Sequence, residues 1–345
     1  MINICLTHKE RVRRALQYQP LDRIPTQINY TADMGKKMAE YFKVAIKDLP
    51  GFLDNHFVRV DINWPQNLSK DGKVMYDWWG VGFSVNEEGY FVSTNPLVET
   101  KDLDTYSWPD PDEIHLLTEA ERVLREDAGQ HFVVPNFGFA LFERAWALRG
   151  LDTFLMDMAL DPAFAEDLLD RILNIQLKLI HRFISLGVDG GYFGDDYGAQ
   201  KNMLFSPKMW RKFIKPRLAR MFASFREIGL PVLMHSDGQI QAIIPDLIEI
   251  GLTALNPVQP EVLDHARLRK EFNESLAYYG GVSTQSILPN GSPDDVKRAV
   301  NACIRELSKE GTGLIVAPSH RVMTDVPLEN IEALLSEFNG MKSHN

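Results

Sequence analysis

Three short stretches in the second half of the chain decide the expected fold: Gly194-Asp195-Asp196-Tyr197-Gly198, His235-Ser236-Asp237-Gly238 and Pro318-Ser319-His320. Each directly follows an apolar run that predicts a buried strand, namely Gly190–Phe193, Pro231–Met234 and Leu314–Ala317. Side chains that titrate or bind metal, placed where strands stop, are typical of the mouth of a (β/α)8 barrel. Three such strand ends therefore predict a functional site.

Working outward, short apolar runs alternate with longer helical patterns. We expect strands at these three runs and near Ile24–Ile28, Phe57–Val60, Phe132–Asn136, Ala254–Asn256 and Ala277–Tyr279. The helical patterns include Pro162–Leu186, Ser206–Ile228, Gln239–Ile250, Asp264–Phe272 and Pro293–Glu310. A capping pattern, Thr7-His8-Lys9-Glu10, opens a further helix at the N-terminal end. This order predicts an α/β fold: one (β/α)8 barrel, or TIM barrel, spanning residues 1–345, with an N-terminal helical lead.

One segment departs from the alternation. Residues Met75–Phe83 and Gly89–Val92 predict the two strands of a β-hairpin, with Asn86-Glu87-Glu88-Gly89 at its turn. The hairpin belongs to an insertion of about residues 72–112, after the second barrel strand. We expect this insertion to cover the carboxyl-terminal mouth of the barrel.

Composition excludes several classes of protein. The chain has 345 residues and a formal net charge of -10, and it contains no run of Lys and Arg that could form a nucleic-acid-binding face. Its two cysteines, Cys5 and Cys303, exclude a disulfide framework and a Cys-rich metal cluster. No apolar stretch is long enough to span a membrane, and the N-terminus is too short for a signal peptide, so the expected location is the cytoplasm.

The pair His235-x-Asp237 is the sharpest chemical signal. Side chains two residues apart on an extended segment point to the same side, and imidazole with carboxylate suits Zn²⁺ or another divalent metal. His320 is the expected third ligand, and Asp195 or Asp196 is a candidate for a fourth. The alternative interpretation is that His235 hydrogen-bonds locally while Asp237 caps the helix near Gln239.

Asp195, Asp196 and Tyr197 form the candidate catalytic cluster. Adjacent carboxylates alternate faces in an extended chain, so only one should point into the mouth, and we expect it to be Asp195. The alternative is a polar loop that caps the next helix.

Other residues are candidates for binding substrate or cofactor. Side chains for substrate are Asn136, Trp79, Trp146, Gln200 and Gln259, with Trp78, Phe83 and Tyr197 as further pocket walls unless these rings only pack in the core. Gly280 and Gly281 would permit close backbone approach to a phosphate or carboxylate after the seventh strand. No P-loop, dinucleotide fingerprint or nucleophile elbow is present.

At these residues the chain resembles the uroporphyrinogen decarboxylase superfamily, which includes zinc-dependent corrinoid methyltransferases. The matching stretches include Gly194–Gln200, Leu233–Gly238, Ile244–Gly251, Asn256–Pro260, Gly280–Val282 and Ala317–His320. The resemblance covers nearly all of residues 185–335 and, more loosely, the N-terminal half.

The chain departs from both branches of that superfamily. The decarboxylase branch carries arginines after its first strand, whereas Gln27–Asp33 contains none, and unclamped substrate carboxylates are costly. The methyltransferase branch holds zinc with His-x-Cys and a distant Cys, but here Asp237 and His320 replace the cysteines. The resulting harder site favours polarising an oxygen, which shifts the expected donor from thiol chemistry toward O-methyl or N-methyl groups.

The resemblance implies a metal-dependent methyltransferase that moves methyl between a small substrate and a corrinoid on a separate protein. The alternatives are a decarboxylase without metal, in which His320 and an acid of the Asp195–Asp196 pair protonate a carbanion-like intermediate, and a non-catalytic small-molecule-binding barrel. The expected partners are a methyl donor and a corrinoid protein, with no nucleic acid and no membrane. The oligomeric state is open, a homodimer being one option.

Overall fold

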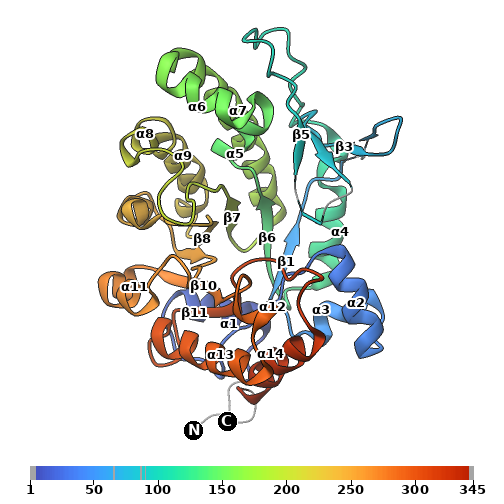
Figure 1. Cartoon of the computed structure of the whole chain (residues 1–345), viewed down its shortest axis with the longest axis vertical. Coiled ribbons are helices and arrows are strands. Elements are labelled where there is room, and N and C mark those ends of the chain that lie inside the picture. The colour runs from blue at the N-terminus through green and yellow to red at the C-terminus, as the bar shows by residue number, and fades with distance from the viewer. Residues whose placement is uncertain (1–4, 65–66, 86–87, 90, 342–345) are drawn as a thin grey trace.

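The computed structural model describes residues 5–64, 67–85, 88–89 and 91–341. A sheet of parallel strands occupies its centre, and helices such as α7, α9, α11 and α13 lie outside it (Figure 1). In the order in which they pair, the strands are β1 (Phe57–Val60), β6 (Phe132–Phe137), β7 (Gly191–Gly194), β8 (Val232–His235), β9 (Ala254–Asn256), β10 (Ala277–Val282) and β11 (Leu314–Pro318). The parallel α/β order expected from the sequence is confirmed.

The expected first strand at 24–28 is not a regular strand. Thr26 forms an isolated parallel bridge to Val316 of β11. On its other side the Thr26 carbonyl accepts a hydrogen bond of 3.2 Å from the amide of His56, directly before β1. This extended segment therefore connects the two edges of the sheet, as a barrel requires, although Pro25 interrupts its ladder because proline has no amide hydrogen to donate.

The helices follow the strands along the chain, as crossover connections between parallel strands require. They are α1 (His8–Leu16), α2 (Ala32–Phe42), α3 (Leu49–Phe52), α4 (Thr118–Asp127), α5 (Phe142–Arg149), α6 (Leu151–Leu160), α7 (Pro162–Leu186), α8 (Pro207–Phe213), α9 (Lys215–Arg226), α10 (Ile244–Glu249), α11 (His265–Phe272), α12 (Ile287–Asn290), α13 (Pro293–Leu307) and α14 (Leu328–Gly340). The expected lead helix is α1, where the Thr7 hydroxyl accepts a hydrogen bond from the Glu10 amide. Among the described residues, no helix is long and apolar enough to cross a membrane.

Two cores hold the sheet in place. One lies inside the ring of strands and contains Phe57, Phe132, Tyr192, Leu233 and Tyr279. The other is larger and lies between the strands and the surrounding helices. Alternate residues of a strand face opposite sides, so each strand contributes to both cores and is buried on both. The carboxyl ends of the strands then form a rim of fixed positions for polar side chains.

The insertion differs from the expected single hairpin. It forms a four-stranded antiparallel sheet in the order β2 (Asn67–Leu68), β3 (Val74–Tyr76), β4 (Gly82–Ser84) and β5 (Val92–Thr94). Residues 75–83 are not one strand, because the Asp77 carboxylate accepts hydrogen bonds from the amides of Trp79 and Val81 and turns the chain. β4 and β5 do pair as expected, while Asn86 and Glu87 of the expected turn lie outside the described residues.

One contact places the β4–β5 connection against the barrel. The Glu88 carboxylate accepts hydrogen bonds from the hydroxyl groups of Thr31 and Thr324. Thr31 follows the extended first segment and Thr324 follows β11, so both belong to the connections that leave carboxyl ends of strands. This contact supports the expectation that the insertion reaches over the mouth.

Candidate metal centre

His235, Asp237 and His320 come together at the carboxyl ends of β8 and β11. The Nε2 atom of His235 lies 3.8 Å from Oδ1 of Asp237, and Nε2 of His320 lies 3.9 Å from Oδ2 of the same carboxylate. One donor atom from each of the three residues lies within 4.8 Å of the others. Residues far apart in the sequence therefore bring three possible ligand atoms close together.

The donor set fits a divalent metal. Ligand atoms on a tetrahedral zinc ion with bonds of 2.0–2.2 Å are separated by about 3.4 Å. The observed separations are somewhat longer, and small side-chain rotations would close the difference. Burial lowers the pKa of His320, the nearby Asp237 carboxylate opposing this effect, and the lower pKa favours the neutral imidazole that metals require.

A buried amide fixes the orientation of His235. Nδ1 of His235 donates a hydrogen bond of 2.7 Å to Oδ1 of Asn256, at the end of β9. Oδ1 also accepts from the Tyr192 hydroxyl at 2.8 Å, and the Asn256 amide nitrogen donates to the Tyr279 carbonyl at 2.7 Å. With the proton held on Nδ1, the lone pair on Nε2 faces Asp237. This is the arrangement in which metal-binding histidines are oriented by their second ring nitrogen.

Of the two adjacent acids, Asp196 borders this cluster. Its Oδ1 atom accepts a hydrogen bond of 2.8 Å from the amide of Asp237 and lies 3.9 Å from Nε2 of His235. Burial raises the pKa of Asp196, while the charge of His235 opposes the shift. Asp196 is thus placed either as a fourth ligand or as a proton carrier.

The expectation that Asp195 points into the mouth is wrong. Asp195 is fully buried, and its carboxylate accepts hydrogen bonds from the amides of Phe142 and Glu143 at the start of α5, at 2.9 and 2.7 Å. The Tyr197 hydroxyl donates to the same carboxylate at 2.8 Å. Burial raises the pKa of Asp195 to about 6, against these hydrogen bonds. Asp195 therefore caps a helix and anchors Tyr197.

The aromatic residues lie differently from the expected pocket walls. Tyr197 is fully buried among Phe142, Phe205 and Trp210, so it does not face the mouth. Trp78, Trp79 and Phe83 are buried in the larger core. Trp146 is half-buried, with its ring centroid 5.8 Å from that of Phe139. Most of these rings therefore pack in the core and do not line a pocket.

Three polar candidates lie near the rim. Asn136, at the end of β6, donates a hydrogen bond of 2.9 Å to Asp61. Gln259 is buried, with Oε1 accepting from the Gly238 amide at 3.3 Å and Nε2 without a hydrogen-bond partner among the described residues. Gln200 is exposed and bonds Gln285 at 3.4 Å. Of the three, Gln259 borders a cavity of about 250 Å³, which is lined by Asp237, Gln259, Thr284, Gln285, Ser319, His320, Arg321, Met323, Asp325 and Val326.

Gly280 and Gly281 do not form the expected ligand-binding turn. Both lie within β10 with positive φ angles of 127° and 93°. A β-carbon on Gly280 would lie 2.0 Å from the carbonyl oxygen of Pro257, and one on Gly281 would lie 2.5 Å from Sγ of Cys303. The space beside each glycine is therefore filled by the protein itself.

Sequence reasoning missed Asp61, Arg59 and Glu143. Asp61 directly follows β1, so the rule that selected the other strand ends would also have selected Asp61. Burial raises the pKa of Asp61, while the Asn136 hydrogen bond opposes the shift. Glu143 opens α5, and burial followed by the charges of Asp196 and Asp195 raises its pKa well above its usual range. Because Glu143 lies in a helix, no strand-end signal marked it.

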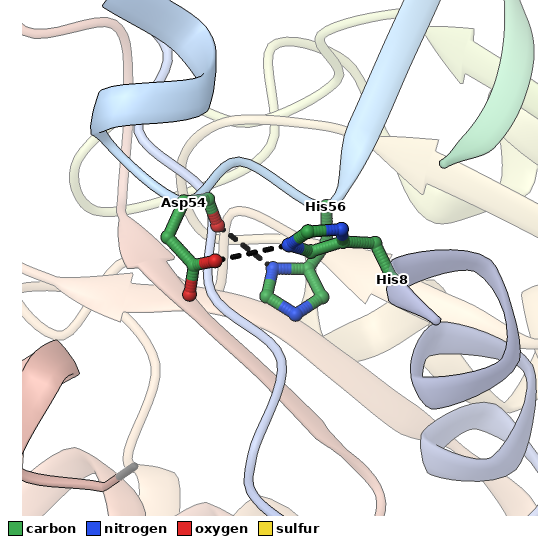
Figure 2. Close-up of side chains that lie close together, drawn as sticks. All are labelled: His8, Asp54 and His56. Atoms are coloured by element: carbon green, nitrogen blue, oxygen red, sulfur yellow. Dashed lines mark hydrogen bonds and ion pairs between the residues drawn. The ribbon is translucent and has the colours of Figure 1, made fainter. Parts of the chain in front are cut away.

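A second His-Asp-His group lies at the opposite end of the strands (Figure 2). His8 donates from Nε2 to Oδ1 of Asp54 at 2.9 Å, and the other Asp54 oxygen pairs with Arg23 at 2.7 Å. Nδ1 of His56 donates to the Asp54 carbonyl at 2.9 Å, and its Nε2 accepts from Arg11 at 3.0 Å. With both nitrogens of His56 engaged and Asp54 neutralised, this group lacks the free donors of a metal site.

The sheet is parallel, and histidines and acids gather at its carboxyl edge. This arrangement is typical of barrel-type enzymes, whose active sites lie at the carboxyl ends of the strands. The particular family follows from comparison with known proteins. Residues 70–340 match the family described as Uroporphyrinogen decarboxylase (URO-D), so the chain belongs to this family.

Three relatives illustrate the similarity. The chain is 21% identical over 358 residues to a uroporphyrinogen decarboxylase of Aliivibrio salmonicida, covering 93% of this chain and 94% of the relative. It is 25% identical over 130 residues to a methylated-thiol–coenzyme M methyltransferase of Methanosarcina mazei, covering 38% and 32%. A solved methyltransferase from Methanosarcina mazei covers 98% of this chain and is itself covered fully, with a TM-score of 0.73 and 20% identity, which shows the shared fold.

Proposed function

We propose that the chain is a metal-dependent methyltransferase that moves a methyl group from a small O- or N-methylated substrate to a corrinoid carried by a partner protein. The observation that supports it is the convergence of His235, Asp237 and His320 on one point at the barrel mouth. A metal held by these residues would supply Lewis-acid polarisation of the substrate heteroatom.

The surrounding residues have separable tasks in this proposal. Asn256 holds the proton of His235 on Nδ1 and so keeps Nε2 available. Asp196 lies beside His235 and supplies the proton that the substrate oxygen takes up when its bond to methyl breaks; a quaternary amine would leave as a neutral amine and needs no such proton. This assignment replaces Asp195, because the Asp195 carboxylate is buried on the α5 amides. The insertion, attached through Glu88, covers the mouth and limits access of water.

The ligand types favour oxygen or nitrogen donors over thiols. Two imidazoles and one carboxylate leave more positive charge on a metal than a set with two thiolates does. A metal of this kind polarises a heteroatom well and is less suited to keeping a bound thiolate nucleophilic. Methoxy-aromatic compounds are the donors to examine first, because a metal can polarise an ether oxygen. Quaternary methylamines come second, because their nitrogen has no lone pair for a metal to polarise.

The first experiment is metal analysis of protein purified without a histidine tag. We expect about one zinc or other divalent metal per chain, and methyl transfer from one of these donors to a reduced corrinoid protein, detected as methyl-cobalt absorbance. Metal-free protein should lose the transfer and regain it when the metal is restored. Full transfer by rigorously metal-free protein would contradict the proposal.

A second candidate function is decarboxylation without metal. It is supported by the similarity to a uroporphyrinogen decarboxylase over 93% of the chain and by acids placed to hold protons: burial raises the pKa of Asp196 and, together with the neighbouring carboxylates, that of Glu143. His320 and Asp196 would then protonate the intermediate. Turnover of uroporphyrinogen with no methyl transfer from any donor would favour this second function.

A further inference from the structure

Arg59 is an interior cation on β1. Phe57, Arg59 and Asp61 alternate along an extended segment, so their side chains share one face. Phe57 belongs to the core inside the ring of strands, where its ring stacks on Tyr279 at 5.1 Å. The guanidinium carbon of Arg59 lies 4.1 Å from the ring centroid of Tyr192, another residue of that core. Arg59 therefore lies inside the ring of strands, between Phe57 and the rim residue Asp61.

Within the described part of the chain, the Arg59 guanidinium donates a single hydrogen bond. Its Nη2 atom donates one long bond of 3.3 Å to the Tyr279 hydroxyl. Nε is buried without a hydrogen-bond partner among the described residues. Asp61 influences Arg59 electrostatically but bonds Asn136 instead, at 2.9 Å. Leaving the buried Nε–H unpaired is costly, and because the Arg59 side chain is only half-buried, its remaining donors can be reached by an external oxyanion.

Arg59 is also connected to the candidate metal centre. The ring of Tyr192 lies beneath this guanidinium, and the Tyr192 hydroxyl donates a hydrogen bond of 2.8 Å to Oδ1 of Asn256. The same oxygen accepts from Nδ1 of His235 at 2.7 Å. Asp237 and Arg59 both act electrostatically on the Tyr192 hydroxyl. A small molecule that touches Arg59 is therefore separated from His235 by little more than one tyrosine and one asparagine side chain.

We propose that Arg59 binds a carboxylate of the substrate, so that the methyl donor is a small organic acid. Its carboxylate lies on Arg59, and its O-methyl or N-methyl group lies at His235, Asp237 and His320. The positioning of the methyl group rests on the proposed function, whereas the carboxylate contact does not. A planar guanidinium pairs with a carboxylate through two parallel hydrogen bonds, which a quaternary ammonium group cannot make.

The test compares two ligands of nearly the same shape, 3-methoxybenzoate and 3-methoxybenzamide, in which a neutral carboxamide replaces the anionic carboxylate. Calorimetry on metal-depleted protein measures binding without any turnover. We expect the acid to bind about 10- to 100-fold more tightly than the amide, as for a hydrogen-bonded charge. In Arg59→Met the two ligands should bind equally, and Arg59→Lys should keep only part of the preference, because lysine supplies charge without the planar fork.

Matched variants separate this proposal from the proposed function. His235→Ala should lose metal yet keep the preference for the acid, so failure of metal binding leaves the carboxylate site measurable. Arg321→Met tests the neighbouring cation at the cavity. Equal binding of acid and amide by the wild-type protein, or a preference abolished in Arg321→Met and intact in Arg59→Met, would overturn the assignment. Thermal unfolding of each variant establishes that it is folded. If Arg59→Met does not fold, the comparison of Arg59→Lys with Arg321→Met decides which of the two cations carries the preference.

Discussion

The two ends of the barrel carry the same three residue types in two different states. At the carboxyl end, Nε2 of His235 and Nε2 of His320 lie 3.8 and 3.9 Å from the Asp237 carboxylate. These distances are too long for hydrogen bonds between the three residues. At the amino end, Asp54 pairs with His8 and Arg23, and the two ring nitrogens of His56 bond Arg11 and the Asp54 carbonyl. Residue type alone therefore does not make a metal site; the difference lies in which lone pairs the protein has already used.

The largest expected effect is on metal content. His235→Ala removes a donor from the carboxyl-end group and should reduce bound metal from about one per chain to near zero, abolishing methyl transfer. His8→Ala is the matched control, because it removes a histidine from the amino-end group and should leave metal content unchanged. If His8→Ala lost the metal and His235→Ala kept it, the metal would be bound at the amino end and not at the carboxyl end. Elemental analysis of both variants provides the measurement.

Substitutions in the amino-end group should instead lower the stability of the fold. Arg11 donates to Asp22 at 2.7 Å and to His56 at 3.0 Å, and Arg11→Ala leaves both partners without this cation. We expect the free energy of unfolding in urea to fall by about 3 kcal/mol. Arg13→Ala, on the exposed side of the same helix, should change it by less than about 1 kcal/mol. Equal effects of the two substitutions would show that the buried network contributes little.

A smaller effect should follow from loosening His235 without removing it. Asn256→Ala deletes the acceptor of the Nδ1 hydrogen bond, and we expect metal affinity to fall about 10- to 100-fold. Asn330→Ala is the control: this buried amide donates to the carbonyls of Leu288 and Gly291, so its loss should lower stability only. Metal titration of both variants distinguishes orientation of the ligand from general loosening of the fold.

The smallest effect concerns pH. Burial, followed by the charges of His8 and Arg23, lowers the pKa of His56 well below its usual range. As the pH falls below about 6.5, the unfolded chain takes up a proton that the folded chain does not, so His56 makes stability decline by at most about 1.4 kcal/mol per pH unit. Above that pH the two states bind equally few protons, and this contribution vanishes.

The check is the pH dependence of unfolding in His56→Asn compared with the wild-type chain, both without metal. His320 also has a lowered pKa and contributes to the slope in both proteins, so only the difference between them reports His56. A variant with the wild-type slope between pH 6.5 and 5 would exclude His56 as its source.

The sequence predicted the order of strands better than the details of the mouth. Short runs rich in apolar residues located β1 and β9 to the residue, because their apolar side chains pack into the two cores, although β1 also contains Arg59 and β9 ends in Asn256. It also brought His235, Asp237 and His320 together, since parallel strands end at one rim. The choice between Asp195 and Asp196 was wrong because the amides of α5 claim Asp195, and a helix contact of this kind leaves no local signal. Gly280 and Gly281 were predicted to bind a ligand, but their missing side chains make room for Pro257 and Cys303 instead.

The single carbonyl oxygen of Asn256 has a thermodynamic consequence. It accepts hydrogen bonds from both His235 and Tyr192, and Tyr192 lies against Arg59. Any ligand that shifts Tyr192 therefore changes the field at His235, and any metal that polarises His235 changes the hydrogen bond available to Tyr192. Coupling between two binding events is reciprocal, so an organic acid on Arg59 and a metal on His235 would alter each other's affinity by the same factor. If the metal and the organic acid bind as proposed, this shared acceptor would couple the two sites within one chain.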